Sequence, residues 1–540
     1  MRWRIDGALT VAAFLFAITS GTPLLGQQFS QILIDGGTDE TIYDALECSD
    51  GSFLLTGATG QFPDPLADAF LLKLTPAGAV VWGRTIGGPN FEYAYRVKER
   101  DDGGFTMAGY TRSGPDPDGD ILLVRTDAAG VVLWANAYGA EGEERCYDLL
   151  LTEDGGCLLT GGTFFDDDRA WDAYLMKIDR DGDIEWVRTY GLSQTNVAHS
   201  VTRTSDNGYL LVGWLYLWGF GGHDLMAIKT DSLGILEFAR IVGGYGDDGG
   251  TAGAEVAPGQ YVLAGSTQSF GGRYNDPDLF FVGFDEYSLS WAKVMIDDGD
   301  SQIVRGCLGE DSSITFAGWI TNPSSGSTDA LLVKCEPDGS IPLVRAYGGG
   351  FEDRGRSVSI SSHSGYVLAG FARRSSGQDG FLVRTDPTWM LGCSDYTPWF
   401  FTSNPEVFAR YILLDTSSQA FAKWSLAAQI GLYAPTIIDW CHATGVGPAS
   451  VEQPHFELTQ NYPNPFNPRT QIRYTLERDG GVRLTVHDLL GRLVLVLVNE
   501  TQETGSHVVS FDAGELPSGT YFYTLQSGER VHTKRMVVVR

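Results

Sequence analysis

Short apolar runs alternate with glycine-rich turns along most of the chain, and one run recurs at a nearly constant interval. It reads Phe53-Leu-Leu-Thr-Gly57 where it first occurs, and equivalent runs end at Gly109, Gly161, Gly213, Gly265, Gly318 and Gly370. Successive glycines are 52, 52, 52, 52, 53 and 52 residues apart. Because β-branched and aromatic residues dominate the runs, the repeat indicates strands rather than helices.

Four strand-like segments follow one another in each repeat. The first ends at a tight turn such as Asp50-Gly51, the second ends in the recurrent glycine, the third opens with Asp, and the fourth carries Trp and closes with Gly-Gly. Turns of the Asp-Gly type suit tight hairpins, which require positive φ angles. Four antiparallel strands in about 52 residues are typical of a propeller blade.

The two ends of the repeat array complement each other. The seventh repeat runs to Asp386 and lacks the Trp strand, whereas the stretch from Phe29 to Gly37 matches the closing glycines of that strand. An open array would need polar caps instead. The sequence therefore predicts an all-β chain whose residues 28–392 form a seven-bladed β-propeller closed by an N-terminal strand.

Acidic residues gather in the loops that follow the Gly-Gly pairs. If the first strand of each repeat is innermost, these loops and the variable loops share one rim, where a rigid scaffold usually presents its binding residues. The variable loops add aromatic side chains. The candidate ligand-binding residues are Asp39, Glu40, Glu92, Glu143, Glu144, Asp247, Asp248, Glu352, Asp353, Trp218 and Tyr274. The aspartates that open each third strand recur in every repeat, which favours a structural role.

The formal charge of −30 argues against nucleic acid and anionic membranes as partners, because both would be repelled. The positively charged start Met1–Arg4 and the apolar run Ala8–Ile18 predict a signal peptide over residues 1–27. No later run reaches the 18 or more apolar residues that a transmembrane helix needs. The 68 glycines fit a chain with many tight turns.

Motifs that would define catalysis are few. Asp179-Arg-Asp-Gly-Asp183 has the acids of a calcium loop, but other repeats carry an ordinary turn there and the final Glu of an EF-hand is missing. No His pair has zinc spacing, and no nucleophile elbow occurs. Val124–Trp134 resembles the tryptophan motif of quinoprotein dehydrogenase propellers, without the vicinal cysteines of that family. We therefore predict no catalytic residue, no metal site and no cofactor.

Residues 393–455 break the repeat and hold Cys393 and Cys441, which are a candidate disulfide because they bracket a segment outside the repeats. The sequence leaves open whether this connecting segment is a small β extension or packs on the repeats. Cys146 and Cys157 are not expected to pair, because hairpin register would place Cys146 opposite a residue near 162.

From residue 456 onward the composition changes, with nine basic and nine acidic groups, and five β-patterned segments follow a proline-rich stretch. These strands, at 471–476, 482–487, 507–511, 520–525 and 531–539, suit an immunoglobulin-like sandwich. The stretches 461–468, 486–492, 516–523 and 534–538 resemble the C-terminal sorting domain of type IX secretion substrates. The residues that carry this resemblance are Asn461, Tyr462, Pro463, Asn464, Pro465, Phe466, Asn467, Pro468, Gly491, Arg492, Gly519, Tyr521 and Lys534.

The resemblance implies a sorting domain over residues 456–540, export through Sec, recognition by the type IX translocon, and release or attachment at the cell surface. For the repeats, we expect non-enzymatic binding or adhesion to an extracellular ligand such as a glycan or peptide. Two alternatives stay open. One is an extracellular enzyme, either a glycan-active hydrolase or a quinoprotein-like protein, and the other is a purely structural surface protein.

Overall fold

The computed structural model describes residues 31–385, with gaps at 37–38, 61–66, 115–117, 141, 166–169, 192–194, 217–221, 271–276, 297–298, 322–325, 349–351, 363–364 and 375–376. It then describes seven short strands between 395 and 439, and residues 457–538 with gaps at 459–460, 462–465, 467, 477, 488–491, 503–504, 515 and 529. The expected signal peptide and both Cys393 and Cys441 lie outside these residues. The described chain contains strands and no helix, which confirms the all-β prediction.

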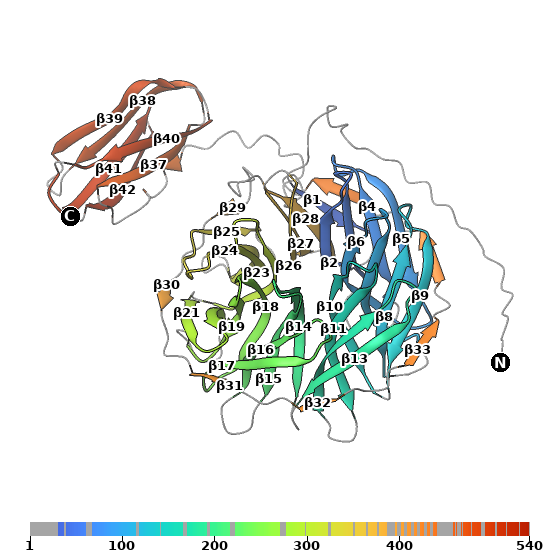
Figure 1. The fold of residues 1–540 in the computed structure, drawn as a ribbon. Helices are drawn as coiled ribbons and strands as arrows, with labels where there is room; N and C mark the ends of the chain where they lie inside the picture. Colours follow the sequence, from blue (N-terminus) through green and yellow to red (C-terminus); the bar gives the residue numbers. More distant parts are fainter. Residues whose placement is uncertain are drawn as a thin grey trace. The chain divides into compact units, whose positions relative to one another are not determined.

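The first four repeats each form an antiparallel sheet whose strands pair in chain order (Figure 1). Sheet 1 contains β2 (Glu40–Glu47), β3 (Phe53–Thr59), β4 (Ala69–Leu74) and β5 (Val80–Gly87). Sheet 2 contains β6 (Glu92–Glu99), β7 (Phe105–Thr111), β8 (Asp120–Thr126) and β9 (Val132–Gly139). Sheet 3 contains β10 (Glu144–Leu151), β11 (Cys157–Phe165), β12 (Ala170–Ile178) and β13 (Ile184–Gly191). Sheet 4 contains β14 (Asn196–Arg203), β15 (Tyr209–Tyr216), β16 (His223–Thr230) and β17 (Leu236–Gly243).

The remaining repeats continue this pattern, and the last one takes a strand from the start of the chain. Sheet 5 contains β18 (Asp248–Ala257), β19 (Gln260–Thr267), β20 (Asp278–Asp285) and β21 (Leu289–Ile296). Sheet 6 contains β22 (Ser301–Leu308), β23 (Ile314–Thr321), β24 (Thr328–Cys335) and β25 (Leu343–Tyr347). Sheet 7 contains β26 (Glu352–Ile360), β27 (Tyr366–Arg374), β28 (Gly377–Arg384) and β1 (Gln31–Asp35). As the sequence predicted, β1 pairs with β28.

The connecting segment supplies a fifth strand to every one of these sheets, in an order that runs backwards along the chain. In Figure 1 these strands, drawn in orange, lie along the outer edges of the sheets. We call them the outer-edge strands. They are β29 (Asp395–Tyr396) on β25, β30 (Phe401–Ser403) on β21, β31 (Phe408–Tyr411) on β17, β32 (Asp415–Ser417) on β13, β33 (Ala422–Ser425) on β9, β34 (Gln429–Leu432) on β5 and β35 (Thr436–Asp439) on β1.

Neighbouring sheets pack face to face through buried apolar side chains. The first strands β2, β6, β10, β14, β18, β22 and β26 contact one another in chain order, and β26 also contacts β2. Each core cluster of the seven sheets draws residues from two consecutive sheets; for example, one cluster joins β1, β27 and β28 of sheet 7 to β2, β3 and β4 of sheet 1. Burial of apolar surface between sheets therefore stabilises the array from one repeat to the next.

Tryptophans of the fourth strands also join one repeat to the next. Trp186 in sheet 3 lies against Gly234, which forms the turn between the last two strands of sheet 4. Gly234 has a φ of 72°, and a Cβ there would lie 2.7 Å from Cζ3 of Trp186. The recurrent tryptophan therefore packs between repeats, and the recurrent turn glycine is its partner.

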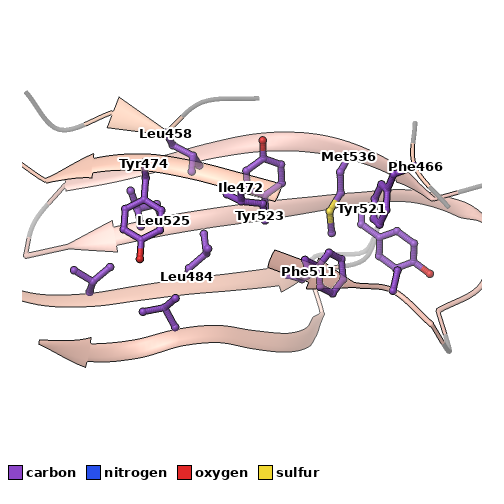
Figure 2. Close-up of a cluster of buried hydrophobic side chains, with 14 of the residues drawn as sticks. Leu458, Phe466, Ile472, Tyr474, Leu484, Phe511, Tyr521, Tyr523, Leu525 and Met536 are labelled. Atoms are coloured by element: carbon purple, nitrogen blue, oxygen red, sulfur yellow. The ribbon is translucent and has the colours of Figure 1, made fainter. Parts of the chain in front are cut away.

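The C-terminal unit, residues 445–540, is a separate compact body. One sheet contains β36 (Glu457–Leu458), β37 (Arg469–Leu476) and β40 (Gly505–Asp512), and the other contains β39 (Leu493–Gln502), β38 (Gly480–His487), β41 (Gly519–Ser527) and β42 (Arg530–Val538). Figure 2 shows the buried side chains gathered between the strands, among them Tyr523, Leu525 and Met536. The five strands expected here are present, and the sequence analysis missed β39.

The Trp–Gly contact can be tested by adding one methyl group. Gly234→Ala is expected to destabilise the protein by at least about 1 kcal/mol more than Gly259→Ala, because overpacking adds to the backbone cost. Gly259 is a matched control, since its φ is 73° and nothing lies within 4 Å of a Cβ placed there. Urea unfolding followed by circular dichroism measures the difference. Equal unfolding midpoints for the two variants would show that the tryptophan contact tolerates the methyl group.

Candidate functional site

Five of the predicted rim acids lie at the start of first strands and are buried, although the sequence placed them in exposed loops. Glu144 accepts hydrogen bonds from the backbone N–H of Ala140 at 3.0 Å and from the hydroxyl of Thr163 at 2.8 Å. The first bond holds the loop that leads in from the preceding sheet, and the second holds the next strand. The buried acids are Glu40, Glu92, Glu144, Asp248 and Asp353. All of them except Asp353 are shown to accept a hydrogen bond from the loop that leads in from the preceding sheet, which indicates a structural role in joining repeats.

The electrostatics of these acids agree with that role. Burial raises the pKa of Glu92, and the nearby charge of Asp68 raises that pKa further, while hydrogen bonds to its carboxylate oppose the shift. Asp68 opens a third strand, and a Cβ on Gly87 would lie 1.8 Å from its Oδ1. Position 87 therefore requires glycine, because the carboxylate of Asp68 packs directly on its backbone and leaves no room for a side chain.

The other four predicted acids are less buried, and each has a protein partner. Asp247 pairs with His223 at 3.2 Å, and Glu143 pairs with Arg145 at 2.6 Å. Glu352 pairs with Arg354 and Arg373, and Asp39 accepts a hydrogen bond from the backbone of Gln378. Trp218 and Tyr274 lie outside the described residues. The structure thus spreads the exposed rim acids over four sheets and does not gather them into one cluster.

A group of charged and aromatic side chains that the sequence analysis missed lies on the first strands. Every first strand has a β-bulge at the equivalent position, where its register against the second strand shifts by one residue. The extra residues are Tyr43, Tyr95, Tyr147, His199, Thr251, Val304 and Arg356. They recur with the repeat spacing, so an alignment of repeats at this column was the signal that could have found them.

Four of the bulged residues form a continuous aromatic row. Ring centroids are 5.0 Å apart for Tyr43 and Tyr95, 5.9 Å for Tyr95 and Tyr147, and 4.7 Å for Tyr147 and His199. Nε1 of Trp214 donates a hydrogen bond to Nε2 of His199 at 3.0 Å. Burial, with a smaller contribution from Arg96, lowers the pKa of His199 to about 4, so its imidazole is neutral at pH 7.

The residues after the bulges carry charges that meet between sheets. Asp148 of sheet 3 contacts Arg96 of sheet 2 at 3.2 Å and Arg305 of sheet 6 at 2.6 Å. The second contact joins residues 157 positions apart. Burial alone would raise the pKa of Asp148, but the charges of Arg305 and Arg96 outweigh it and hold the pKa at about 2. Asp148 is therefore ionised and ties three sheets together.

Asp44 also connects neighbouring sheets, through hydrogen bonds instead of ion pairs. Its carboxylate accepts hydrogen bonds from the Ser357 hydroxyl at 2.6 Å and from the backbone N–H of Val97 at 3.1 Å. These donors belong to sheets 7 and 2, which lie on either side of sheet 1 in the sheet order. We call the whole group the inner-strand cluster, and its members are Tyr43, Asp44, Tyr95, Arg96, Lys98, Tyr147, Asp148, His199, Arg305 and Arg356.

Two cavities of the described chain lie at the end of the sheets where the tight turns gather. One of about 340 Å³ is lined by Trp186, Tyr209 and the ion pair of Lys177 with Asp154, whose atoms are 2.7 Å apart. Its other charged pair, Arg203 with Glu153, is also closed at 2.5 Å. Since these polar groups satisfy one another, this site has a structural explanation.

Chemistry at the described residues is limited. No group of three or more His, Cys, Asp or Glu side chains within them could hold a metal ion. The described cysteines are free, and Cys146 lies opposite Gly161 rather than bonded to Cys157. Burial raises the pKa of Cys146 and of Cys157 to about 12, so both thiols are protonated at neutral pH and are weak nucleophiles.

Some of the sorting residues form part of the C-terminal core. The backbone N–H of Asn461 donates to the Tyr523 hydroxyl at 2.6 Å, and its side-chain amide donates to Thr470 at 3.0 Å. Phe466 is buried, and the Tyr521 hydroxyl donates to the backbone of Pro517. Lys534 is exposed. Tyr462, Pro463, Asn464, Pro465, Asn467 and Gly491 lie outside the described residues.

The C-terminal unit defines an exported protein. Residues 460–539 match the family of secretion system C-terminal sorting domains, which confirms the resemblance to type IX secretion substrates. The protein is therefore secreted or attached to the cell surface. No helix of the described chain is long and apolar enough to cross a membrane.

Comparisons of the remaining chain are less informative. No curated protein sequence matches the chain. A crystal structure of a eukaryotic initiation factor is 10% identical, with a TM-score of 0.28, over 61% of this chain and 98% of that chain. A tetra-tandem repeat from the extending region of a large adhesion protein is 12% identical, with a TM-score of 0.13, over 87% of this chain and 95% of that chain. At these TM-scores neither likeness supports an argument about fold or function.

The ion pairs of Asp148 predict a large effect of a nearly isosteric change. Asp148→Asn should destabilise the protein by about 3–5 kcal/mol, because it leaves Arg96 and Arg305 buried without a countercharge. Asp181→Asn, at an exposed ion pair with Arg180, should change stability by less than about 1 kcal/mol. Chemical denaturation at pH 7 compares the two variants with the wild type.

Acid should reduce the difference in stability between the wild type and Asp148→Asn. The folded pKa of Asp148, about 2, lies below the ordinary value of about 3.9. Its contribution is therefore complete above about pH 4 and is lost as the pH falls towards 2. A gap between wild type and Asp148→Asn that stays constant down to pH 2 would contradict the assignment.

Proposed function

We propose that the seven sheets are the blades of one closed propeller, which is exported and binds an extracellular ligand without catalysis. Three observations support closure: β1 completes sheet 7, β26 packs against β2, and Arg305 of sheet 6 reaches Asp148 of sheet 3. A chain of sheets whose last member contacts the first leaves no exposed face at either end.

The proposed ligand site is the rim formed by the Gly-Gly loops and the variable loops. The observation that carries this proposal is the buried acid at the start of the first strands. Glu144, for example, accepts hydrogen bonds from the incoming loop and from the second strand, and so fixes the strands that support these loops. Loops that vary in length and sequence on a rigid frame are the usual location of binding residues. Exposed acids such as Asp247, together with the loop aromatics Trp218 and Tyr274, suit a glycan or a cationic peptide.

Delivery to the surface is proposed to depend on an immunoglobulin-like sorting domain that the type IX translocon recognises. The two packed sheets with a shared apolar core support such a sandwich. Within the sorting motif, Asn461 and Phe466 hold the fold, whereas Lys534 is exposed and available to a partner. This division separates residues needed for folding from those that can contact the translocon.

Removing the sorting domain should stop surface delivery. Deletion of residues 456–540 is expected to leave the protein inside the cell envelope, as measured by immunoblotting of periplasmic, surface and medium fractions. Lys534→Ala should reduce surface delivery if this residue contacts the translocon, and Val531→Ala, at a neighbouring position that is 52% exposed, is the matched control. Surface display that is unchanged after the deletion would refute the proposed sorting role.

Ligand binding can be tested on the secreted full-length chain with glycan and cationic-peptide arrays. The double variant Trp218→Ala, Tyr274→Ala should weaken ligand binding at least about tenfold, because it removes one or two aromatic contacts with the ligand. The control is Tyr287→Ala, because Tyr287 is 79% exposed in a turn between third and fourth strands, at the other end of its sheet. No binding by the wild type would favour a structural surface protein, and turnover of an arrayed glycan would favour the enzyme.

A further inference from the structure

The inner-strand cluster contains a cation that no described residue pairs. Lys98 of sheet 2 has no hydrogen bond and no ion pair within the described part of the chain. The lysines of the third strands differ in this respect, because each has a carboxylate partner; for example, Lys229 lies 2.7 Å from Asp206 and 2.6 Å from Glu237. An ammonium group offers three donors and accepts none, so an unpaired one inside a protein is costly.

The surroundings of Lys98 make its charge harder to maintain. Burial is the main cause that lowers its pKa, and the charges of Arg305 and Arg96 lower it as well. Asp44 and Asp148 oppose this shift. Three cations from sheets 2 and 6 therefore face two carboxylates from sheets 1 and 3, so the group carries a net positive charge within a protein of net charge −30.

Both carboxylates are already committed to other partners. Asp148 binds Arg96 and Arg305, and Asp44 accepts its hydrogen bonds from Ser357 and from backbone N–H groups. Nη1 of Arg305 is buried and has no hydrogen-bond partner in the described chain. Two donors therefore lack an acceptor among the described residues: the ammonium group of Lys98 and Nη1 of Arg305. They interact electrostatically with each other and with the same two carboxylates.

Lys98 also keeps some accessible surface although burial dominates its pKa shift. Tyr95 and His199 show the same combination. Partial accessibility together with a pKa shift caused by burial is expected of side chains that line a hydrated interior, and not of side chains on the outer surface. A small ligand with oxygen acceptors could replace water there and reach donors from several sheets at once.

We propose that the inner-strand cluster binds a small oxyanion, a phosphate or a carboxylate group, held by Lys98 and Arg305. The anion supplies the acceptors that Lys98 and Nη1 of Arg305 lack, and it cancels the excess positive charge. Asp148 keeps Arg305 in place, so Arg305 is fixed before the ligand arrives. This site is independent of ligand binding at the loop rim and would persist if the rim bound nothing.

The test is thermal unfolding of the full-length protein with sodium phosphate, sodium acetate or sodium chloride at equal ionic strength. A saturating oxyanion should raise the Tm by at least about 2 °C over chloride, because it binds only the folded state. A response to phosphate alone assigns a phosphoryl group, a response to acetate alone assigns a carboxylate, and a response to both assigns the shared chemistry. No response beyond chloride overturns the proposal.

Lys98→Met provides the decisive variant, because it removes the charge and keeps an unbranched side chain. It should abolish the oxyanion-dependent rise in Tm while leaving the Tm in chloride equal or higher, since an unpaired buried charge is lost. Lys229→Met is the matched control. It should lower the Tm in chloride, because it leaves Asp206 and Glu237 unpaired, and retain the full oxyanion response. A Lys98→Met protein that responds like the wild type overturns the assignment.

Discussion

Hydrogen bonding between consecutive sheets through buried carboxylates is the interaction on which the rest of the repeat array depends. A carboxylate at the start of a first strand, such as Glu144, accepts from the loop that arrives from the preceding sheet and from the second strand of its own sheet. This carboxylate is buried, so the loss of either donor would leave one of its oxygens without a hydrogen-bond partner in a medium of low dielectric constant. This requirement fixes where each sheet starts relative to its neighbour. The Trp–Gly contacts at the opposite end of the sheets and the apolar clusters between their faces then act on sheets that are already in register.

The strands could be predicted from the sequence because each signal was local or periodic. The 52-residue spacing, the Asp-Gly turns and the Trp positions are all visible along the chain, and even the pairing of β1 with β28 followed from matching Ile34–Gly37 to the closing glycines of the fourth strands. The site was harder to predict for two physical reasons. Glu40 and Glu92 have loop neighbours in sequence, and only the folded hydrogen bonds show that they are buried. The β-bulge shifts alternation by one residue, so simple strand periodicity gives the wrong face for every residue beyond Tyr43 or Tyr95.

The outer-edge strands explain how a connecting segment without a repeat can belong to a repeat protein. The free edge of a four-stranded sheet presents unpaired backbone groups, and such edges promote pairing with other chains. The segment from β29 to β35 covers these edges one after another in reverse order, so that each receives a strand of two to four residues. Backbone pairing demands little of the side chains, which is why the sequence of this segment carries no trace of the period. Coverage of all seven edges suits a protein that functions outside the cell, where partners with exposed strands would otherwise add to the sheets.

Charge is distributed in this molecule in a way that composition alone would not suggest. The excess of acidic residues belongs to the repeats and the connecting segment, since the stretch from residue 456 is neutral, yet the first strands bring Arg96, Lys98 and Arg305 together in the interior. Acidic side chains on the outside keep a protein soluble at little energetic cost. Cations gathered in the interior have the opposite effect, because desolvation penalises each of them and they repel one another. Arg96 and Arg305 share the carboxylate of Asp148, whereas Lys98 has no ion-pair partner among the described residues. A fold stabilised only by its own contacts would lose nothing by replacing Lys98 with an apolar residue, as the equivalent Leu46 and Leu150 of sheets 1 and 3 illustrate. The retention of a charge at this one position is therefore better explained by an anion from outside the chain than by the stability of the chain itself.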